Sequence, residues 1–268
     1  MRDPAAPIGV FDSGIGGLTV VGELHRRLPN ESVVYVGDTA RVPYGPKSPE
    51  TVLRYSREIA DFLVNRGVKA VVIACNTATA HALPSLQAEL PIPVMGVVQP
   101  GARAALAASR GGAIGVVGTA GTIRSGAYEH AIHALDASKH VFSQPCPLFV
   151  PLVEEGWLDH EVTRMVAREY LGSLMEKGVD TLVLGCTHYP LLVPLLRGIL
   201  GPDVALIDSA RETAVELGSL LAREGLANPG EHPVEHSYLA TDDQQRMLEL
   251  GQRFLGLPME RVDALVLG

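Results

Sequence analysis

Cysteine is scarce in this chain of 268 residues. Only Cys75, Cys146 and Cys186 are present, and none of them shows the Cys-x-x-Cys spacing that is typical of zinc and redox sites. An odd and sparse set argues against a disulfide framework and against a cysteine-only zinc site. We therefore expect reduced thiols, no metal, and a cytoplasmic location.

Clusters of basic residues and long apolar runs are also missing. The formal net charge is −8 at pH 7, and no stretch gathers Lys and Arg, so nucleic acid is not an expected partner. The opening residues MRDPAAPIGVFDSG lack the apolar core of a secretory signal. No apolar run approaches the roughly 20 residues that a membrane helix needs. We expect a soluble protein with no membrane partner.

Short β-branched runs alternate with amphipathic segments along most of the chain. The segments 49–67 and 159–178 are typical of helices, and Gly67 and Gly178 stand where a helix should end. Continuous apolar strands between helices indicate an α/β fold with mostly parallel sheets that helices flank. The expected strands are 8–11, 33–37, 70–75, 93–97, 113–118, 181–186, 204–208 and 236–241.

A coarse internal repeat divides the chain. VVIACNTATA (71–80) and TLVLGCTHYP (181–190) each run from an apolar strand into a cysteine that a threonine follows. The repeat predicts two similar α/β domains, 1–98 plus 209–268 and 99–208, with the active site in the cleft between them. Functional side chains of such sheets lie at the carboxyl ends of strands.

The two repeated cysteines are the strongest candidates for chemistry. A free cysteine is usually a small core residue, which is the interpretation for Cys146. Cys75 and Cys186 differ, because each ends a strand and a helix is expected to follow. A helix N-terminus favours thiolate, so at least one thiol should have a lowered pKa. Polar neighbours that could orient a substrate follow each cysteine: Asn76, Thr77, Thr187 and His188.

Other strand ends offer groups that also have ordinary structural roles. Asp12 and Ser13 could hold an anion or cap a helix, as could Thr119. Tyr44 and Gly45 could present backbone amides or form a turn. Glu154 and Glu155 form an acidic pair before an expected helix, and such a pair usually faces solvent. Sequence alone does not decide which of the two would assist a thiol or His188.

Two thiols that face one stereocentre could invert it, one removing a proton while the other donates one to the opposite face. A pyridoxal phosphate enzyme would need a lysine at the site for its Schiff base. The chain has four lysines, and none stands convincingly at the predicted site. The expectation is a reaction without a cofactor.

Seven segments together resemble the successive motifs of the bacterial glutamate racemases, in the aspartate/glutamate racemase family. They are FDSGIGGLTV, YVGDTARVPYG, IACNTATA, GVVGTAGTI, PLFVPLVEEG, LVLGCTHYPLL and IDSARETA, in this order from about Ile8 to the C-terminus. The resemblance implies a cofactor-independent isomerase that makes D-glutamate for peptidoglycan, and hence for cell shape. It implies catalytic roles for Cys75, Cys186, Asp12, Glu154 and His188, and substrate binding by Asp12, Ser13, Tyr44, Gly45, Asn76, Thr77, Thr119, Thr187 and His188.

Three alternatives remain at this level. An aspartate racemase would share the two-thiol arrangement. A binding protein for an anionic metabolite would explain the Ser, Thr and Gly loops without needing paired thiols. A thiol-redox protein is disfavoured because no second cysteine lies close in sequence. The sequence leaves open whether the chain forms a homodimer.

Overall fold

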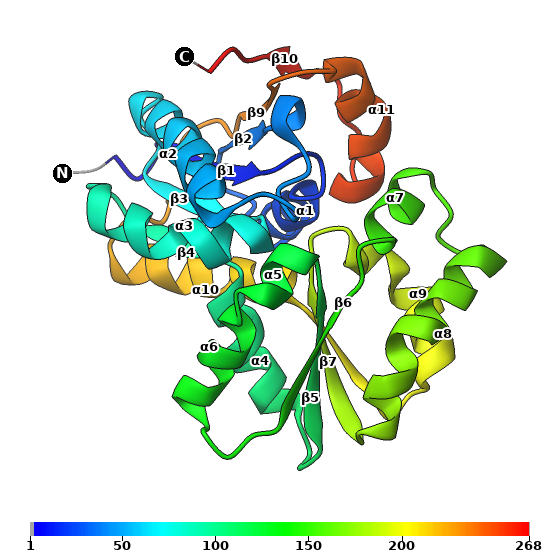
Figure 1. Ribbon diagram of the computed structural model, residues 1–268. Helices are drawn as coiled ribbons and strands as arrows, with labels where there is room; N and C mark the ends of the chain where they lie inside the picture. The colour runs from blue at the N-terminus through cyan, green and yellow to red at the C-terminus, as the bar shows by residue number, and fades with distance from the viewer. Residues whose placement is uncertain (1–2, 268) are drawn as a thin grey trace. The chain divides into compact units, whose positions relative to one another are not determined.

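The computed structural model describes residues 3–267 (Figure 1). Met1, Arg2 and Gly268, which belong to the expected first domain, lie outside this range. The described chain divides into two compact units. The first comprises the residues up to Val97 together with those from Ala210 onward, and the second is Val98–Ser209.

The first unit is built on a six-stranded sheet in the order β10-β9-β2-β1-β3-β4, and every pair is parallel. Its helices pack as pairs, α2 with α3 and α1 with α11. The strands are β1 Ile8–Asp12, β2 Val33–Gly37, β3 Ala70–Ile73, β4 Val94–Gly96, β9 His236–Ala240 and β10 Asp263–Ala264. The helices are α1 Leu18–Arg27, the 3-10 turn η1 Thr39–Arg41, α2 Pro49–Asn65, α3 Asn76–Glu89, α10 Ser209–Arg223 and α11 Gln244–Leu255.

Local sequence explains where α2 begins and what it buries. The Ser48 hydroxyl accepts a hydrogen bond from the Thr51 N–H, and Pro49 occupies the first turn, where its missing N–H costs nothing. The apolar face of the helix packs on the sheet in one buried cluster. Members of this cluster include Phe11, Val34, Val36, Val71 and Ile73 from the strands and Val52, Ile59 and Leu63 from α2.

The second unit has a four-stranded parallel sheet in the order β6-β5-β7-β8. Helices α4 and α6 lie to one side of it and α8 and α9 to the other (Figure 1). The strands are β5 Ala113–Gly118, β6 Val141–Pro145, β7 Val179–Gly185 and β8 Ala205–Asp208. The helices are α4 Val98–Ala108, α5 Ala120–Arg124, α6 Ala127–Leu135, α7 Phe149–Glu154, α8 Glu161–Glu176, the 3-10 turn η2 Tyr189–Leu192 and α9 Val193–Leu200.

The two sheets repeat one strand order. The four strands β2-β1-β3-β4, which end at one edge of the first sheet, correspond to β6-β5-β7-β8 in the second, with β3 equivalent to β7. Cys75 follows β3 and Cys186 follows β7, so the two thiols occupy equivalent positions at the carboxyl ends of equivalent strands. The predicted α/β fold with parallel sheets is confirmed, and all eight expected strands are present.

Two strands were not predicted. The sequence of β6, VFSQP, has no continuous apolar run, because this edge strand is only partly buried. Strand β10 has only two residues, which is too short for a periodic signal. Among residues 3–267 no helix combines the length and apolar character needed to span a bilayer.

Candidate functional site

Asp12 lies at the carboxyl end of β1 and opens a tight turn. One of its carboxylate oxygens, Oδ2, accepts a hydrogen bond of 3.1 Å from the Gly14 N–H, and the residue is almost completely buried. Gly17 closes the turn against it. A Cβ on Gly17 would stand 2.5 Å from the Cβ of Asp12 and 3.0 Å from that of Ala74, so any larger residue here would displace the turn. The glycines of FDSGIGG thus let the chain pack tightly around the carboxylate.

Cys75 lies beside this turn, two residues beyond the end of β3. It is the N-cap of α3, and its Sγ accepts a hydrogen bond from the Ala78 N–H at 3.4 Å. The thiol also donates to Oγ of Ser13 at 3.7 Å. The first unit therefore brings together three of the predicted site residues: Asp12, Ser13 and Cys75.

The expected lowering of a thiol pKa is wrong for Cys75. Burial disfavours the thiolate, and the nearby Asp12 carboxylate adds repulsion, which together raise the pKa of Cys75 to about 12. The N–H of Ala78 and the hydroxyl of Ser13 act in the opposite direction and are outweighed. The helix N-terminus is present, but desolvation of a residue that is only 6% exposed is the larger effect.

A raised pKa predicts a thiol that reacts slowly at rest. In a protein carrying Cys146→Ala and Cys186→Ala, alkylation of Cys75 by iodoacetamide should be slow at pH 7.5 and should rise steadily to above pH 10, because only the thiolate reacts. The rate is measured by quenching the alkylation at a series of times and quantifying the product by mass spectrometry. A plateau below pH 9 would show that the thiol ionises near or below its ordinary pKa and would contradict this prediction.

Asn76 and Thr77 form the first turn of α3, directly after the thiol. Both are buried at 2% exposure. Their position beside Cys75 results from the immediate start of the helix, which ends the expected strand 70–75 early, at Ile73.

The side chain of Tyr44 is buried inside the first unit and is not free to bind a substrate. The residue is 1% exposed, and its hydroxyl donates to the buried carboxylate of Asp38. Burial and the Asp38 charge raise the pKa of Tyr44. The side chain is therefore an internal anchor, and only the backbone of Tyr44 and the buried Gly45 remain as groups that could meet a ligand.

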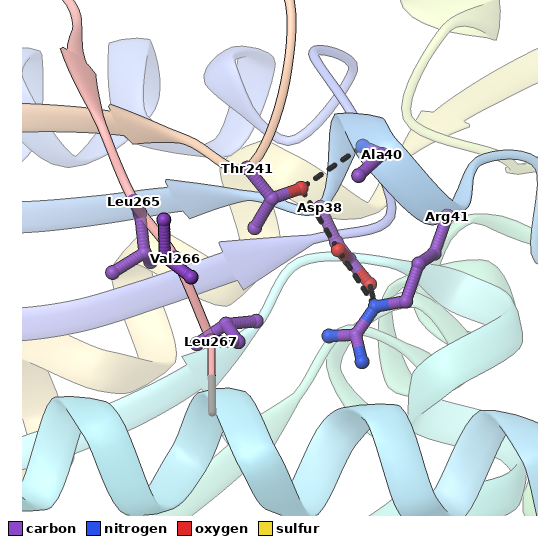
Figure 2. A pocket seen from close by; sticks show the side chains of 7 residues that line it. All are labelled: Asp38, Ala40, Arg41, Thr241, Leu265, Val266 and Leu267. Atoms are coloured by element: carbon purple, nitrogen blue, oxygen red, sulfur yellow. Dashed lines mark hydrogen bonds and ion pairs between the residues drawn. The ribbon is translucent and has the colours of Figure 1, made fainter.

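Asp38 is a central residue of this region that the sequence interpretation did not single out. Besides Tyr44, its carboxylate accepts hydrogen bonds from Nε of Arg41 at 2.7 Å and from the Thr241 hydroxyl at 3.0 Å (Figure 2). Arg41 in turn pairs with Glu58. The position of Asp38 in the sequence could have indicated its importance. It directly follows β2, just as Asp12 ends the adjacent strand β1, and its neighbour Gly37 pairs with Asp12 in the sheet.

A cavity of about 210 Å³ borders the Asp38 network (Figure 2). Ala40 and three residues near the C-terminus line it with apolar side chains, and the remaining lining is polar. The residues of the wall are Asp38, Ala40, Arg41, Thr241, Leu265, Val266 and Leu267. The Thr241 hydroxyl accepts from the Ala40 N–H and donates to Asp38, so the polar lining is largely engaged with itself.

Cys186 of the second unit lies beside an imidazole and a carboxylate. Its Sγ is 3.9 Å from Nδ1 of His188, and Nε2 of His188 is 3.0 Å from Oε1 of Glu154. Because an ionised carboxylate only accepts hydrogen bonds, Nε2 is the donor in the contact with Glu154, and the other ring nitrogen, Nδ1, faces the thiol. Thr187 Oγ1 lies 3.4 Å from the same Nδ1.

The adjacent acidic residues at the end of α7 differ in their contacts. Glu154 is half-buried and bonded to His188, whereas Glu155 caps the helix end and is exposed. The structure thus brings Glu154, and not Glu155, to His188. The helix expected directly after Cys186 is a short 3-10 turn that begins only at Tyr189, so Cys186 is not a helix N-cap.

The remaining candidates have plain structural placements. Thr119 is the N-cap of α5, with its hydroxyl accepting from the Thr122 N–H at 3.3 Å. Cys146 is fully buried and donates to the Gln144 carbonyl, which confirms its prediction as a core residue. Within residues 3–267, no three His, Cys, Asp or Glu side chains are arranged to hold a metal ion.

Comparisons with known proteins agree with one another. The model of the Asp/Glu/Hydantoin racemase family matches residues 8–217. The chain is 54% identical to the glutamate racemase of Geobacter metallireducens over 253 residues, which is 94% of each chain. Its fold is similar to that of a solved glutamate racemase, RacE1 from Bacillus anthracis, with a TM-score of 0.94 at 44% identity over 98% of each chain. It is also similar to the Francisella tularensis glutamate racemase solved with D-glutamate, with a TM-score of 0.92 at 40% identity over 98% of each chain.

Proposed function

Because this chain belongs to the Asp/Glu/Hydantoin racemase family and is therefore an isomerase, we propose that it interconverts L- and D-glutamate. One observation carries the proposal beyond family membership. Each unit presents a buried cysteine at the carboxyl end of an equivalent strand, and each cysteine has its own polar partners. A protein that only binds an anion has no need of such a thiol in each unit.

The proposed reaction is a proton exchange at Cα between two thiols. One cysteine, as thiolate, takes the α-proton: the C–H bond breaks, an S–H bond forms, and the electron pair stays on the substrate as a carbanion delocalised into its carboxylate. The other cysteine donates its proton to the opposite face, so its S–H bond breaks as the new C–H bond forms. The configuration inverts, and the two thiols have exchanged roles.

Because its pKa is high in the free protein, Cys75 begins as a protonated thiol and can act as the proton donor in one direction of the reaction. To act as a base it must ionise, and the ammonium group of a bound amino acid would favour the thiolate by opposite charge. Asp12, which lies beside Cys75, is the group we assign to assist that thiol. His188, held by Glu154, is the group we assign to assist Cys186.

Substrate binding must stabilise the carboxylate on which charge builds during the reaction. We assign substrate binding as a whole to residues at the strand ends, most of which offer hydroxyls, amides or backbone N–H groups. They are Asp12, Ser13, Tyr44, Gly45, Asn76, Thr77, Thr119, Thr187 and His188, with Tyr44 contributing its backbone because its hydroxyl is bonded to Asp38. We propose that the reaction runs without a cofactor, in the cytoplasm, and supplies D-glutamate for peptidoglycan and cell shape.

Circular dichroism with purified protein tests the substrate assignment directly. Pure L-glutamate should lose its optical activity at a rate proportional to enzyme concentration, and D-glutamate should do the same from the opposite sign. L-Aspartate should react far more slowly. A clear preference for aspartate would overturn the substrate, and tight binding of glutamate without any loss of optical activity would favour a binding protein instead.

The two adjacent glutamates offer a matched pair of variants. Glu154→Gln should lower kcat by about 10- to 100-fold, because His188 loses the carboxylate that orients its ring toward Cys186. Glu155→Gln, one residue away and exposed, should change kcat by less than about twofold. Steady-state racemisation rates for both variants decide the point. Equal effects, or the larger effect at Glu155, would refute the assignment of Glu154.

A further inference from the structure

Tyr35 lies in the middle of β2 and is completely buried. In the register of the sheet it pairs with Val10 of β1, while Gly37 pairs with Asp12. Because side chains alternate along a strand, Tyr35 and Gly37 share the sheet face of Asp12. The phenol ring can therefore extend toward the turn that Asp12 opens.

The phenolic oxygen of Tyr35 reaches that turn. It donates a hydrogen bond of 2.6 Å to the carbonyl oxygen of Gly14, the same residue whose N–H is bonded to the Asp12 carboxylate. The ring of Tyr35 also lies close to Gly17 of the same turn, since a Cβ on Gly17 would stand 3.1 Å from the ring. A buried tyrosine hydroxyl needs a hydrogen-bond partner, and here the partner belongs to the Asp12 turn.

Two glycines, Gly17 and Gly37, make this contact possible because they have no side chain. A Cβ on Gly37 would lie 2.4 Å from the Gly14 carbonyl oxygen, so glycine allows the turn to settle over β2. A Cβ on Gly17 would lie 3.1 Å from the Tyr35 ring as well as 2.5 Å from Asp12. The ring of Tyr35 thus packs directly against the Asp12 turn, which lies next to Cys75.

We propose that Tyr35 is a positioning residue for the Cys75 half of the reaction, acting through the Asp12–Gly17 turn. It touches no reacting atom in this account. Its hydroxyl fixes the Gly14 carbonyl and thereby the orientation of Asp12 and Ser13 toward the thiol. The inference rests on the proposed function, because it assigns a role within that reaction.

The sheet supplies a matched control. Tyr238 of β9 is the in-register partner of Tyr35 on the neighbouring strand, and its hydroxyl bonds to Nε2 of His25 at 3.0 Å, away from the Asp12 turn. Tyr35→Phe and Tyr238→Phe therefore each remove one hydroxyl from the same sheet. Tyr35→Phe should lower kcat/KM by about tenfold, and Tyr238→Phe by less than about twofold.

An isotope measurement distinguishes positioning from general loosening. The two enantiomers have equal free energies, so kcat/KM changes equally in both directions, but the isotope effects need not. With α-deuterated substrates, slowing the transfer at Cys75 should raise the isotope effect on kcat/KM for the enantiomer that Cys75 deprotonates and lower it for the other. Asp12→Asn should shift the pair of values in the same sense, and His188→Asn in the opposite sense.

The possible outcomes distinguish a failure of the Tyr35 positioning role from a failure of the proposed racemisation of glutamate. If the unmodified protein does not racemise glutamate, the proposed function fails first. If it does, and Tyr35→Phe behaves like Tyr238→Phe or shifts both isotope effects alike, the positioning role is wrong. Thermal melts of both variants check folding. Should Tyr35→Phe not fold, Gly17→Ala, which presses on the same turn, must give the Asp12-type isotope shift or the inference falls.

Discussion

Replacement of either Cys75 or Cys186 by alanine should reduce the rate of glutamate racemisation by about 10⁴-fold or more. Each single change removes one of the two groups that carry the proton in the proposed reaction. The polar partners of the two thiols are distinct, with Ser13 beside Cys75 and His188 beside Cys186, so neither thiol can substitute for the other. Polarimetry with L- and D-glutamate measures the loss.

Cys146→Ala is the control for this experiment. Its thiol is fully buried and bonded to a backbone carbonyl, so its loss should lower thermal stability somewhat and leave kcat within about twofold. A variant of Cys75 or Cys186 that retained a tenth of the original rate would show that its thiol does not carry the proton. A single-base mechanism or a different nucleophile would then be needed.

Asp12→Asn should lower kcat by about 10²- to 10³-fold with the protein still folded. Asparagine keeps the shape of the turn and can still accept from the Gly14 N–H, but it removes the negative charge beside Cys75. That charge contributes to the raised pKa of Cys75, after burial, so the variant thiol should ionise at a lower pH than the original. The alkylation rate of Cys75 should therefore rise at pH 8–9 while catalysis falls.

Asp180→Asn is the matching control for a carboxylate with a structural task. Asp180, at the beginning of β7, accepts hydrogen bonds from the N–H groups of Arg110 and Gly112 and from Ser109. Its replacement should lower the melting temperature and change kcat little. If Asp12→Asn gave the same pattern, a lower melting temperature with kcat maintained, Asp12 would be a structural cap only.

The fold followed from the sequence because its signal is local. Apolar runs such as AVVI and AIGVVG form strands buried on both faces, and every strand predicted from such a run is present. The cysteines could be selected for the same reason, since each stands directly after such a run. The edge strand β6 was missed because a half-exposed strand carries no such pattern.

Features that depend on distant residues could not be predicted in this way. The buried state of the Tyr44 hydroxyl depends on Asp38, and Asp38 depends on Thr241, which lies 203 residues away in sequence. The pKa of Cys75 went against expectation for a related reason. The helix N-terminus is visible in the sequence, whereas the depth of burial and the approach of Asp12 appear only once β1 and β3 lie side by side in the sheet.

The most direct test of the central claim is an incubation with L-glutamate in D₂O without added cofactor, following the α-proton signal and circular dichroism together. We expect the α-proton to be lost as optical activity falls, and both changes to disappear in Cys75→Ala and in Cys186→Ala. The first D-glutamate formed should carry solvent deuterium, because the donating thiol is a different group from the one that took the proton. D-Glutamate that kept its original α-proton would show a single base acting on both faces and would contradict the two-thiol reaction.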